Sequence, residues 1–334
     1  MTDIRDDGTA PPQRAAVTGD RRRGRRRRGE QPMVPDAQFA SYYGKPVLNK
    51  PTWQARDIAG YLFLGGLAGA SSVLAAGAQL TGRAGLARHC KTGALVAISG
   101  SLFALIHDLG RPARFVNMLR MVKPTSPMSI GSWILMAYGP AAGVAAVSDL
   151  TGILPRTGRA AALGAALAGP AVAAYTAPLI ANTAVPTWHE GHRELPFVFV
   201  GSAASAAGGL GMLTTPVGEA GPARRAAMLG GALEIAAIKS MERSMGLAAE
   251  PLHTGKAGKL MRAAETLTVI GASLGGVLGR RSRIAAASGG VAALAGSACT
   301  RFGIFHAGVA SAEDPKYVVA PQRNRLEERK GQPA

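Results

Sequence analysis

Apolar stretches long enough to cross a bilayer alternate with short polar connections along most of the chain. Eight of them hold about 20 residues each, which is the length of a membrane-spanning helix. They lie near 58–80, 91–109, 129–150, 160–182, 195–215, 223–241, 263–280 and 284–305. Charged residues such as Glu234, Lys239 and Glu265 interrupt or border the sixth and seventh stretches. The pattern predicts an all-α integral membrane protein with eight transmembrane helices.

The composition supports helices that pack closely in lipid. The 334 residues are 47% hydrophobic but only 5% aromatic, and 44 of them are glycines. Helices in a bilayer associate through close backbone contact, which small residues allow. Gly65 and Gly69 lie one turn apart in the first stretch, and Gly201 and Gly208 occur in the fifth. We expect these glycines to serve packing.

The segments before and after the apolar stretches differ from them in composition. Residues 1–37 are rich in Arg, Asp, Gly and Pro and have too few aliphatic residues for a core, which predicts a disordered basic tail. Residues 38–57 are interpreted as a membrane-surface segment that ends near the interfacial Trp53, and residues 311–334 as a second tail. The arginine run at 21–28 has no interleaved aromatic residues, which favours contact with anionic membrane lipids over nucleic acid.

The distribution of basic residues predicts the orientation. An even number of spans puts both termini on one side, and this side, with the even-numbered connections, carries more than twice as many Lys and Arg residues as the other. Basic connections stay in the cytoplasm. We therefore expect a multi-pass cell-membrane protein with both termini, and the polar connection at 107–133, on the cytoplasmic side.

Three motifs in the first half resemble a known family. They are Tyr-Leu-Phe-Leu-Gly-Gly-Leu-Ala-Gly at 61–69, His-Asp-Leu-Gly-Arg-Pro-Ala-Arg-Phe at 107–115 and Pro-Thr-Ser-Pro-Met-Ser-Ile-Gly-Ser-Trp at 124–133. Together, in this order, they resemble the NrfD/polysulfide reductase membrane-subunit family. The resemblance implies two four-helix bundles, here 58–182 with a quinone site and 183–310. It also implies a haem-free anchor that exchanges electrons between menaquinone or a related quinone and a ferredoxin-like iron–sulfur subunit, which serves a molybdopterin-type catalytic subunit.

The resemblance also implies quinone-contacting residues. Tyr175 corresponds in position to a tyrosine that contacts quinone in polysulfide reductase relatives, although a buried tyrosine can also serve packing alone. Tyr61 and Asp57 lie at the mouth of the first span, where relatives carry polar quinone-contacting side chains such as histidine and asparagine. This chain departs from that pattern, and Tyr61 can alternatively serve as an interfacial anchor.

Charged residues of the second motif suggest proton transfer and docking. His107 can exchange a proton near neutral pH, and the adjacent Asp108 could pass it to solvent. Both residues lie at a helix end, where polar side chains are also ordinary. Arg111 and Arg114 are expected either to neutralise Asp108 or to dock an acidic surface of the iron–sulfur partner.

Glu234 is the carboxylate that lies well inside an apolar stretch. A carboxylate within the membrane is a functional candidate, because its burial is costly. Glu234 and Glu265 are therefore candidates for proton movement coupled to quinone chemistry. The alternative for both is a polar residue that faces the bundle and pairs with a neighbour.

The sequence gives little basis for a metal in this chain. Cys90 and Cys299 are far apart and form no CxxC pair, so we expect no iron–sulfur cluster or structural metal here. Four of the six histidines fall in connections, and only His107 and His306 lie near helix ends on the same side. A single haem between these two is conceivable, but the expectation is a chain without haem.

Two other functions remain as alternatives. Glycine-rich helices with charged residues also occur in ion-coupled transporters, but no internal repeat is evident here. A purely structural anchor would hold an enzyme at the membrane without contacting quinone. Substrate uptake by proteoliposomes that hold this chain alone would favour the transporter, whereas indifference to Tyr175→Phe would distinguish an anchor from a quinone-binding subunit.

Overall fold

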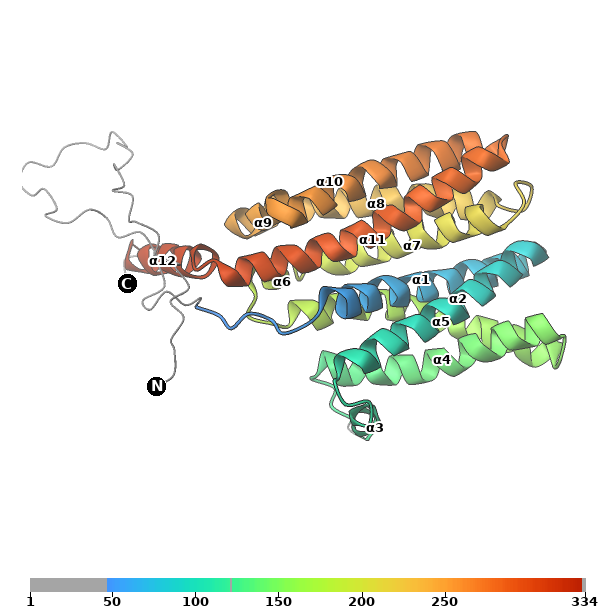
Figure 1. Cartoon of the computed structure of the whole chain (residues 1–334), viewed down its shortest axis with the longest axis horizontal. Helices are drawn as coiled ribbons and strands as arrows, with labels where there is room; N and C mark the ends of the chain where they lie inside the picture. The colour runs from blue at the N-terminus through green and yellow to red at the C-terminus, as the bar shows by residue number, and fades with distance from the viewer. Residues whose placement is uncertain (1–46, 121, 332–334) are drawn as a thin grey trace, which may run out of the picture.

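The computed structural model describes residues 47–120 and 122–331, with side chains up to residue 325. All regular secondary structure in these residues is helical. The expected disordered tail at 1–37 and the start of the membrane-surface segment at 38–46 lie outside the described residues. Residues 47–54 lead without regular structure into the first helix (Figure 1).

The first half of the molecule is built by four long helices and two short ones. They are α1 (Ala55–Leu80), α2 (Ala84–Asp108), α3 (Arg114–Leu119), α4 (Pro127–Thr151), α5 (Pro155–Ala181) and α6 (Pro186–Glu190). The second half contains α7 (Leu195–Thr214), α8 (Gly221–Met245), η1 (Gly246–Ala249), α9 (Glu250–His253), α10 (Gly255–Ile270), the π-helical η2 (Gly271–Val277), η3 (Leu278–Arg280), α11 (Arg283–Glu313) and α12 (Lys316–Gly331).

The all-helical class is confirmed, and each expected apolar stretch falls on a long helix except 263–280, which covers the end of α10 together with η2 and η3. Within the described residues, five helices are long and apolar enough to cross a membrane, namely α1, α2, α4, α5 and α7. The helices α8, α10 and α11 fall outside this group, and α10 has only 16 residues. The chain is therefore a helical membrane protein whose apolar helices are concentrated in its first half.

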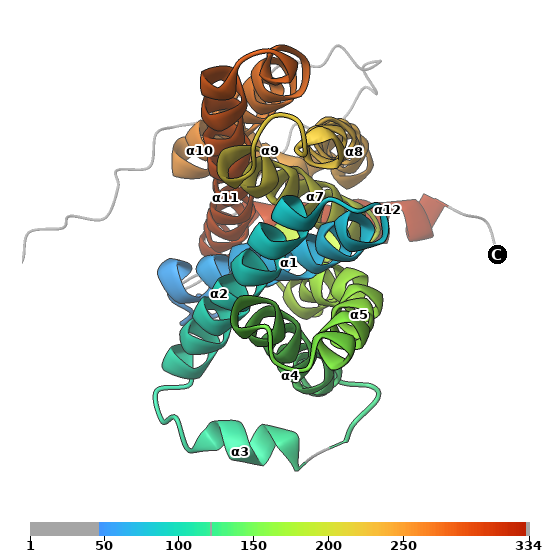
Figure 2. The ribbon, with the colours of Figure 1, turned by 90° about the vertical axis from the view of Figure 1, so that its right-hand side faces the viewer.

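The long helices lie roughly side by side in two groups. Figure 2 shows α1, α2, α4 and α5 in one half and α7, α8, α10 and α11 in the other. Helix α1 lies centrally, because it packs against α2 and α5 in its own half and against α7 and α11 in the other. This position makes α1 a shared wall of both groups.

Small residues allow this close packing, as expected for helices in lipid. On α1, Gly65 faces Ser101 of α2, whereas Gly69 lies against the backbone of Gly169 on α5. A Cβ at Gly201 of α7 would lie 2.7 Å from the backbone nitrogen of Glu234 on α8. The glycines noted in the sequence therefore lie at helix contacts, and at Gly69, Gly201 and Gly208 the neighbour is the backbone of another helix.

Proline and glycine residues set where α4 and α5 begin and where α4 ends. Pro127 and Pro155 occupy the first turns of α4 and α5, where a missing N–H costs nothing. Gly152 has a φ of 75° and ends α4, because a left-handed residue without Cβ stops a helix without strain. The α4–α5 connection is therefore short, and the two helices pack as an antiparallel pair.

The segment expected to form a tail, 311–334, is largely helical where the structure describes it. Helix α11 continues to Glu313, and α12 then packs across the end of the bundle near α6 and η1 (Figure 1). Lys316 contacts Glu250 at 2.6 Å, and Arg325 contacts Glu190 at 3.2 Å. The ion pairs hold α12 against the ends of two other elements.

Candidate functional site

A small apolar cavity lies between α1, α2, α4 and α5, at the end of the bundle where α3 is found. Its volume is ≈ 60 Å³, and side chains from five helices and the segment before α1 line it. The residues lining it are mainly aliphatic and aromatic, and they include Trp53, Ile58, Tyr61, Leu62, Leu105, Asp108, Met118, Met128, Ser132, Leu135, Tyr175 and Ile180. Tyr61, Tyr175 and Asp108 are the candidates from the sequence that meet here.

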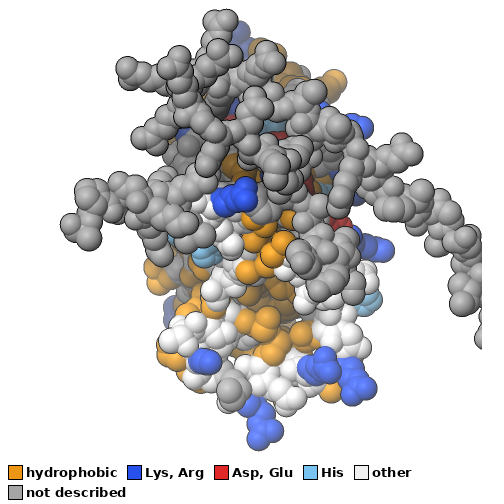
Figure 3. All heavy atoms as spheres, turned by 90° about the vertical axis from the view of Figure 1, so that its left-hand side faces the viewer, with side chains coloured by type: hydrophobic (Ala, Val, Ile, Leu, Met, Phe, Trp, Pro, Cys, Tyr) orange, Lys and Arg blue, Asp and Glu red, His pale blue; other side chains and the backbone are white. Residues whose placement is uncertain are grey.

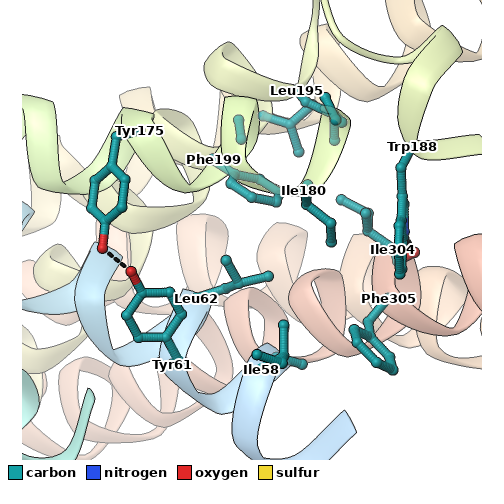
Figure 4. Close-up of a cluster of buried hydrophobic side chains, with 14 of the residues drawn as sticks. Ile58, Tyr61, Leu62, Tyr175, Ile180, Trp188, Leu195, Phe199, Ile304 and Phe305 are labelled. Carbon is teal, nitrogen blue, oxygen red and sulfur yellow. Dashed lines mark hydrogen bonds between the residues drawn. The ribbon is translucent and has the colours of Figure 1, made fainter. Parts of the chain in front are cut away.

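The two tyrosines form the polar centre of the cavity. The hydroxyl of Tyr61 on α1 is hydrogen-bonded to that of Tyr175 on α5, and Figure 4 shows the two rings converging from opposite sides. The rings meet edge to face, with centroids 6.5 Å apart. Both side chains are buried. A group that accepts or donates hydrogen bonds could therefore be held between two phenols in an otherwise apolar slot.

A glycine of the third motif makes room for this arrangement. A Cβ at Gly131 of α4 would overlap the ring of Tyr175. No other residue type leaves this space, because all others carry a Cβ. The motif around Gly131 thus sets the position of the Tyr175 ring through packing.

Three ionisable side chains cluster beside the tyrosines. Nδ1 of His107 lies 2.9 Å from Oδ2 of Asp57, which is buried, whereas the His107 side chain is 60% exposed. His107 also stacks on Phe103 at 6.0 Å between ring centroids. Asp108 lines the cavity and accepts a hydrogen bond from the backbone of Gln54. The carboxylate that contacts His107 is therefore Asp57, rather than the adjacent Asp108 that the sequence suggested.

Arg111 and Arg114 follow this cluster on the α2–α3 connection and the start of α3. Both are exposed, and neither forms an ion pair with Asp108 or with another acid in the described part of the chain. Figure 3 shows Lys and Arg side chains along the lower edge of this end, the edge on which Figures 1 and 2 place α3. Arg111 and Arg114 are therefore exposed basic side chains in the segment that follows the cavity-lining Asp108.

Trp53 contacts more than the membrane surface that the sequence suggested. Its ring stacks on Trp188 of α6 at 5.9 Å between centroids, and the indole nitrogen of Trp188 donates a hydrogen bond of 2.8 Å to the carbonyl of Ile304. Trp188 also packs against Phe305 on α11 (Figure 4). An aromatic contact therefore connects the cavity with the second half of the molecule.

Glu234 lies outside the cavity, in the second half. It is 1% exposed and accepts hydrogen bonds from Thr300 at 2.6 Å and from Thr268 at 3.4 Å. Glu265, by contrast, lies at the surface, where its carboxylate is 3.4 Å from the amine of Lys239. Of these two acids, Glu234 is the buried one, and the structure separates it from the tyrosine pair.

Arg301 on α11 is a buried charged residue that the sequence reasoning missed. It is 1% exposed, its guanidinium carbon lies 3.8 Å from the centroid of the Phe199 ring, and Nη2 donates 2.7 Å to the Phe199 carbonyl. Nε and Nη1 have no hydrogen-bond partner in the described residues. A visible signal was its place inside the apolar stretch 284–305, where an arginine is costly.

No group of three or more His, Cys, Asp or Glu side chains in the described ranges is arranged to hold a metal ion. Cys90 is buried and Cys299 is half-buried, and both are free. His107 is engaged by Asp57, whereas His306 packs edge to face on Phe305.

The fold and the cavity define a class: a helical membrane protein with a tyrosine-walled apolar site at one end of its first four long helices. The sequence matches the family described as polysulphide reductase, NrfD, over residues 48–218, which is just over half of the chain, and the chain belongs to this family. The match includes all the helices that line the cavity. Comparison with curated proteins found no match.

Proposed function

We propose that this chain is the quinone-reactive membrane subunit of an oxidoreductase complex. It exchanges electrons between menaquinone, or a related quinone, and a ferredoxin-like iron–sulfur subunit that serves a molybdopterin-type catalytic subunit. The observation that carries the proposal is the pair of phenol hydroxyls of Tyr61 and Tyr175, which meet in an apolar cavity within the family-matching half.

The chemistry of a quinone suits these groups. A quinone takes up two electrons and two protons to become a quinol, and the electrons come from or go to the iron–sulfur partner. A phenol can donate a hydrogen bond to a quinone oxygen in a site that excludes water. Because the two hydroxyls already face each other, either one can turn toward an oxygen placed between the rings. Tyr61 and Tyr175 are proposed to hold and orient the quinone headgroup.

The protons require a route to water, and the adjacent cluster offers one. The buried Asp57 contacts the largely exposed His107, so this pair connects the interior with the surface. Asp108 lines the cavity itself. We assign these three side chains to proton exchange between the quinone and the solvent, because imidazole and carboxylate groups change protonation within the physiological range or near it.

The small volume of the cavity implies that the quinone opens it. Ligand pockets usually measure about 300–1,000 Å³, whereas this one measures ≈ 60 Å³. The flexible side chains of Met118 on α3 and Met128 on α4 form part of its wall, and unbranched methionines adapt readily to a ligand. Entry of a ring therefore requires these side chains to move and the tyrosine pair to separate.

The remaining expectations form part of the same proposal. The long helices of both halves, including α8, α10 and α11, cross the cell membrane as two bundles, with Glu234 and Arg301 buried inside the second one. The basic bias places both termini in the cytoplasm. The exposed Arg111 and Arg114 then offer a basic surface for an acidic iron–sulfur partner, and the buried Glu234 is a candidate for coupled proton movement.

The test is purification of the tagged chain in mild detergent with its native partners, followed by analysis of bound quinone, iron and molybdenum. We expect menaquinone or a related quinone, an iron–sulfur protein and a molybdoenzyme. The variant Tyr175→Phe should lose bound quinone and quinone turnover while retaining the partners. The control Tyr138→Phe removes another buried phenol, which pairs with Ser72 at 2.7 Å away from the cavity, and should retain quinone.

Other outcomes would favour the alternatives. If Tyr175→Phe retains full quinone turnover, or if the complex assembles without quinone, a structural anchor fits better. If the chain is recovered alone, without quinone or partners, transport by reconstituted vesicles becomes the function to test.

A further inference from the structure

A second and larger cavity lies at the opposite end of the first half from the tyrosine pair. It measures ≈ 610 Å³ and is formed by the end of α1, the start of α2, the end of α4 and the start of α5. Its lining includes Arg88, His89, Lys91, Asp149 and Arg159. The proposed quinone chemistry uses none of these residues.

The charge of this cavity is positive. Lys91, which is 6% exposed, and Arg88 both contact the carboxylate of Asp149, at 3.0 and 3.1 Å. One acid therefore faces two bases, and Arg159 adds a third positive charge whose guanidinium forms no ion pair within the described residues. A lining with excess positive charge recruits anions, and arginine is suited to phosphate oxygens.

Further donors are available in the same cavity. The buried Nδ1 of His89 has no hydrogen-bond partner in the described part of the chain. Pro155 and Gly158 place the first turn of α5, a helix of 27 residues, against the cavity, and the amides of a first turn favour anions. The first turn of α2 is occupied instead, because Glu219 accepts hydrogen bonds from the backbone of Gly85 at 2.8 Å and of Leu86 at 3.2 Å.

Exposed apolar side chains flank the charged cavity. Leu80 at the end of α1, Leu150 at the end of α4, and Ile153 and Leu154 on the following connection are 56–72% exposed. This combination suits an amphiphile, whose charged head would enter the cavity while its chains lie along the apolar surface. A membrane end of the helix bundle is also where lipid headgroups are found.

We propose that this cavity binds the phosphate of an anionic phospholipid headgroup. Arg159 and Arg88 contact the phosphate oxygens, and the apolar rim contacts the acyl chains. The site is separate from the tyrosine cavity, so this proposal does not depend on the proposed quinone function.

The test uses the full chain in detergent, titrated with phosphatidylglycerol or phosphatidylcholine and examined by native mass spectrometry. We expect phosphatidylglycerol to bind preferentially, and Arg159→Gln to weaken its binding about tenfold, because one charge-assisted hydrogen bond is lost. Arg281→Gln is the matched control, since Arg281 is exposed on the η3–α11 connection and does not line the cavity. It should leave the binding unchanged.

A second variant is expected to strengthen lipid binding, which a misfolded protein would not do. Asp149→Asn removes the only acid of the lining and releases Lys91 and Arg88, so it should strengthen the binding of phosphatidylglycerol. Equal binding of the two lipids, or equal effects of Arg159→Gln and Arg281→Gln, would overturn the proposal. Displacement of the lipid by inorganic phosphate at matched ionic strength would also overturn the lipid assignment, and would identify a site for soluble phosphate.

Discussion

The hydroxyls of Tyr61 and Tyr175 are hydrogen-bonded to each other across the interface between α1 and α5. The two tyrosines are 114 positions apart in the sequence. Hydrogen bonds between helices in membranes stabilise a protein by about 0.6 kcal/mol on average. Tyr61→Phe and Tyr175→Phe should therefore lower the unfolding free energy by about this amount, and the double variant should lose little more than either single one. Reversible unfolding in mixed detergent micelles measures these differences. A loss of several kcal/mol would mean that the pair is primarily structural.

Gly131 should be intolerant of any side chain. Gly131→Ala places a methyl group on the Tyr175 ring and should displace the ring, which lowers quinone affinity about tenfold or more. Binding of a quinone analogue to the purified protein measures the change. Gly139→Ala on the same helix is the control, because no atom lies within 4 Å of a Cβ at that position. Similar losses in both variants would contradict the role of Gly131.

Glu234 and Arg301 should depend on each other. Each is buried, and they interact electrostatically within the second half. Removing one charge leaves the other uncompensated in a buried site, which is unfavourable. We expect Glu234→Gln and Arg301→Gln each to destabilise the protein strongly, and the double variant to be more stable than the sum of the two predicts. Thermal unfolding of the unmodified protein, the two single variants and the double variant gives a double-mutant cycle. Strictly additive losses of stability would show that the two charges are independent.

Ion pairs at the surface should control the docking of α12. The hydrogen bond from Lys316 to Glu250 raises the pKa of the lysine. This pair is therefore fully formed at neutral pH and is lost as the pH rises through the raised pKa of Lys316. Glu250→Gln at neutral pH should increase hydrogen exchange of α12 amides about two- to fivefold, and added salt should act in the same direction. Glu265→Gln, which removes an acid that pairs with Lys239, should leave α12 unchanged.

The long helices could be predicted because apolar runs of sufficient length have few alternatives in a membrane. Their ends were harder to place. We expected the second span to begin near residue 91, whereas α2 begins at Ala84. The charges of Arg88 and Lys91 suggested a connection, but Asp149 on α4 neutralises them and allows the helix to include them.

The site could be predicted in part, since the motifs contain Tyr61 and Asp108, the family resemblance implied Tyr175, and the three residues line one cavity. The partners of these residues could not be predicted, because they come from distant helices. Asp57 contacts His107, which is 50 residues away in the sequence, and Arg301 donates a hydrogen bond to the carbonyl of Phe199 on α7. Sequence neighbours suggested His107 and Asp108 as a pair, but adjacent residues on a helix point in different directions.

Helix α1 belongs to the packing of both halves of the molecule, so one rigid helix contacts residues in each of them. Tyr61 faces the cavity on one side of this helix, whereas a Cβ at Gly66 on another side would lie 3.3 Å from Nη2 of Arg301. The two positions are about 7.5 Å apart along the helix axis. A rod this stiff cannot shift or rotate at one of them while the other stays still. Any displacement of the α1 backbone by an entering ring would therefore reach the position that faces the buried guanidinium within less than two helical turns.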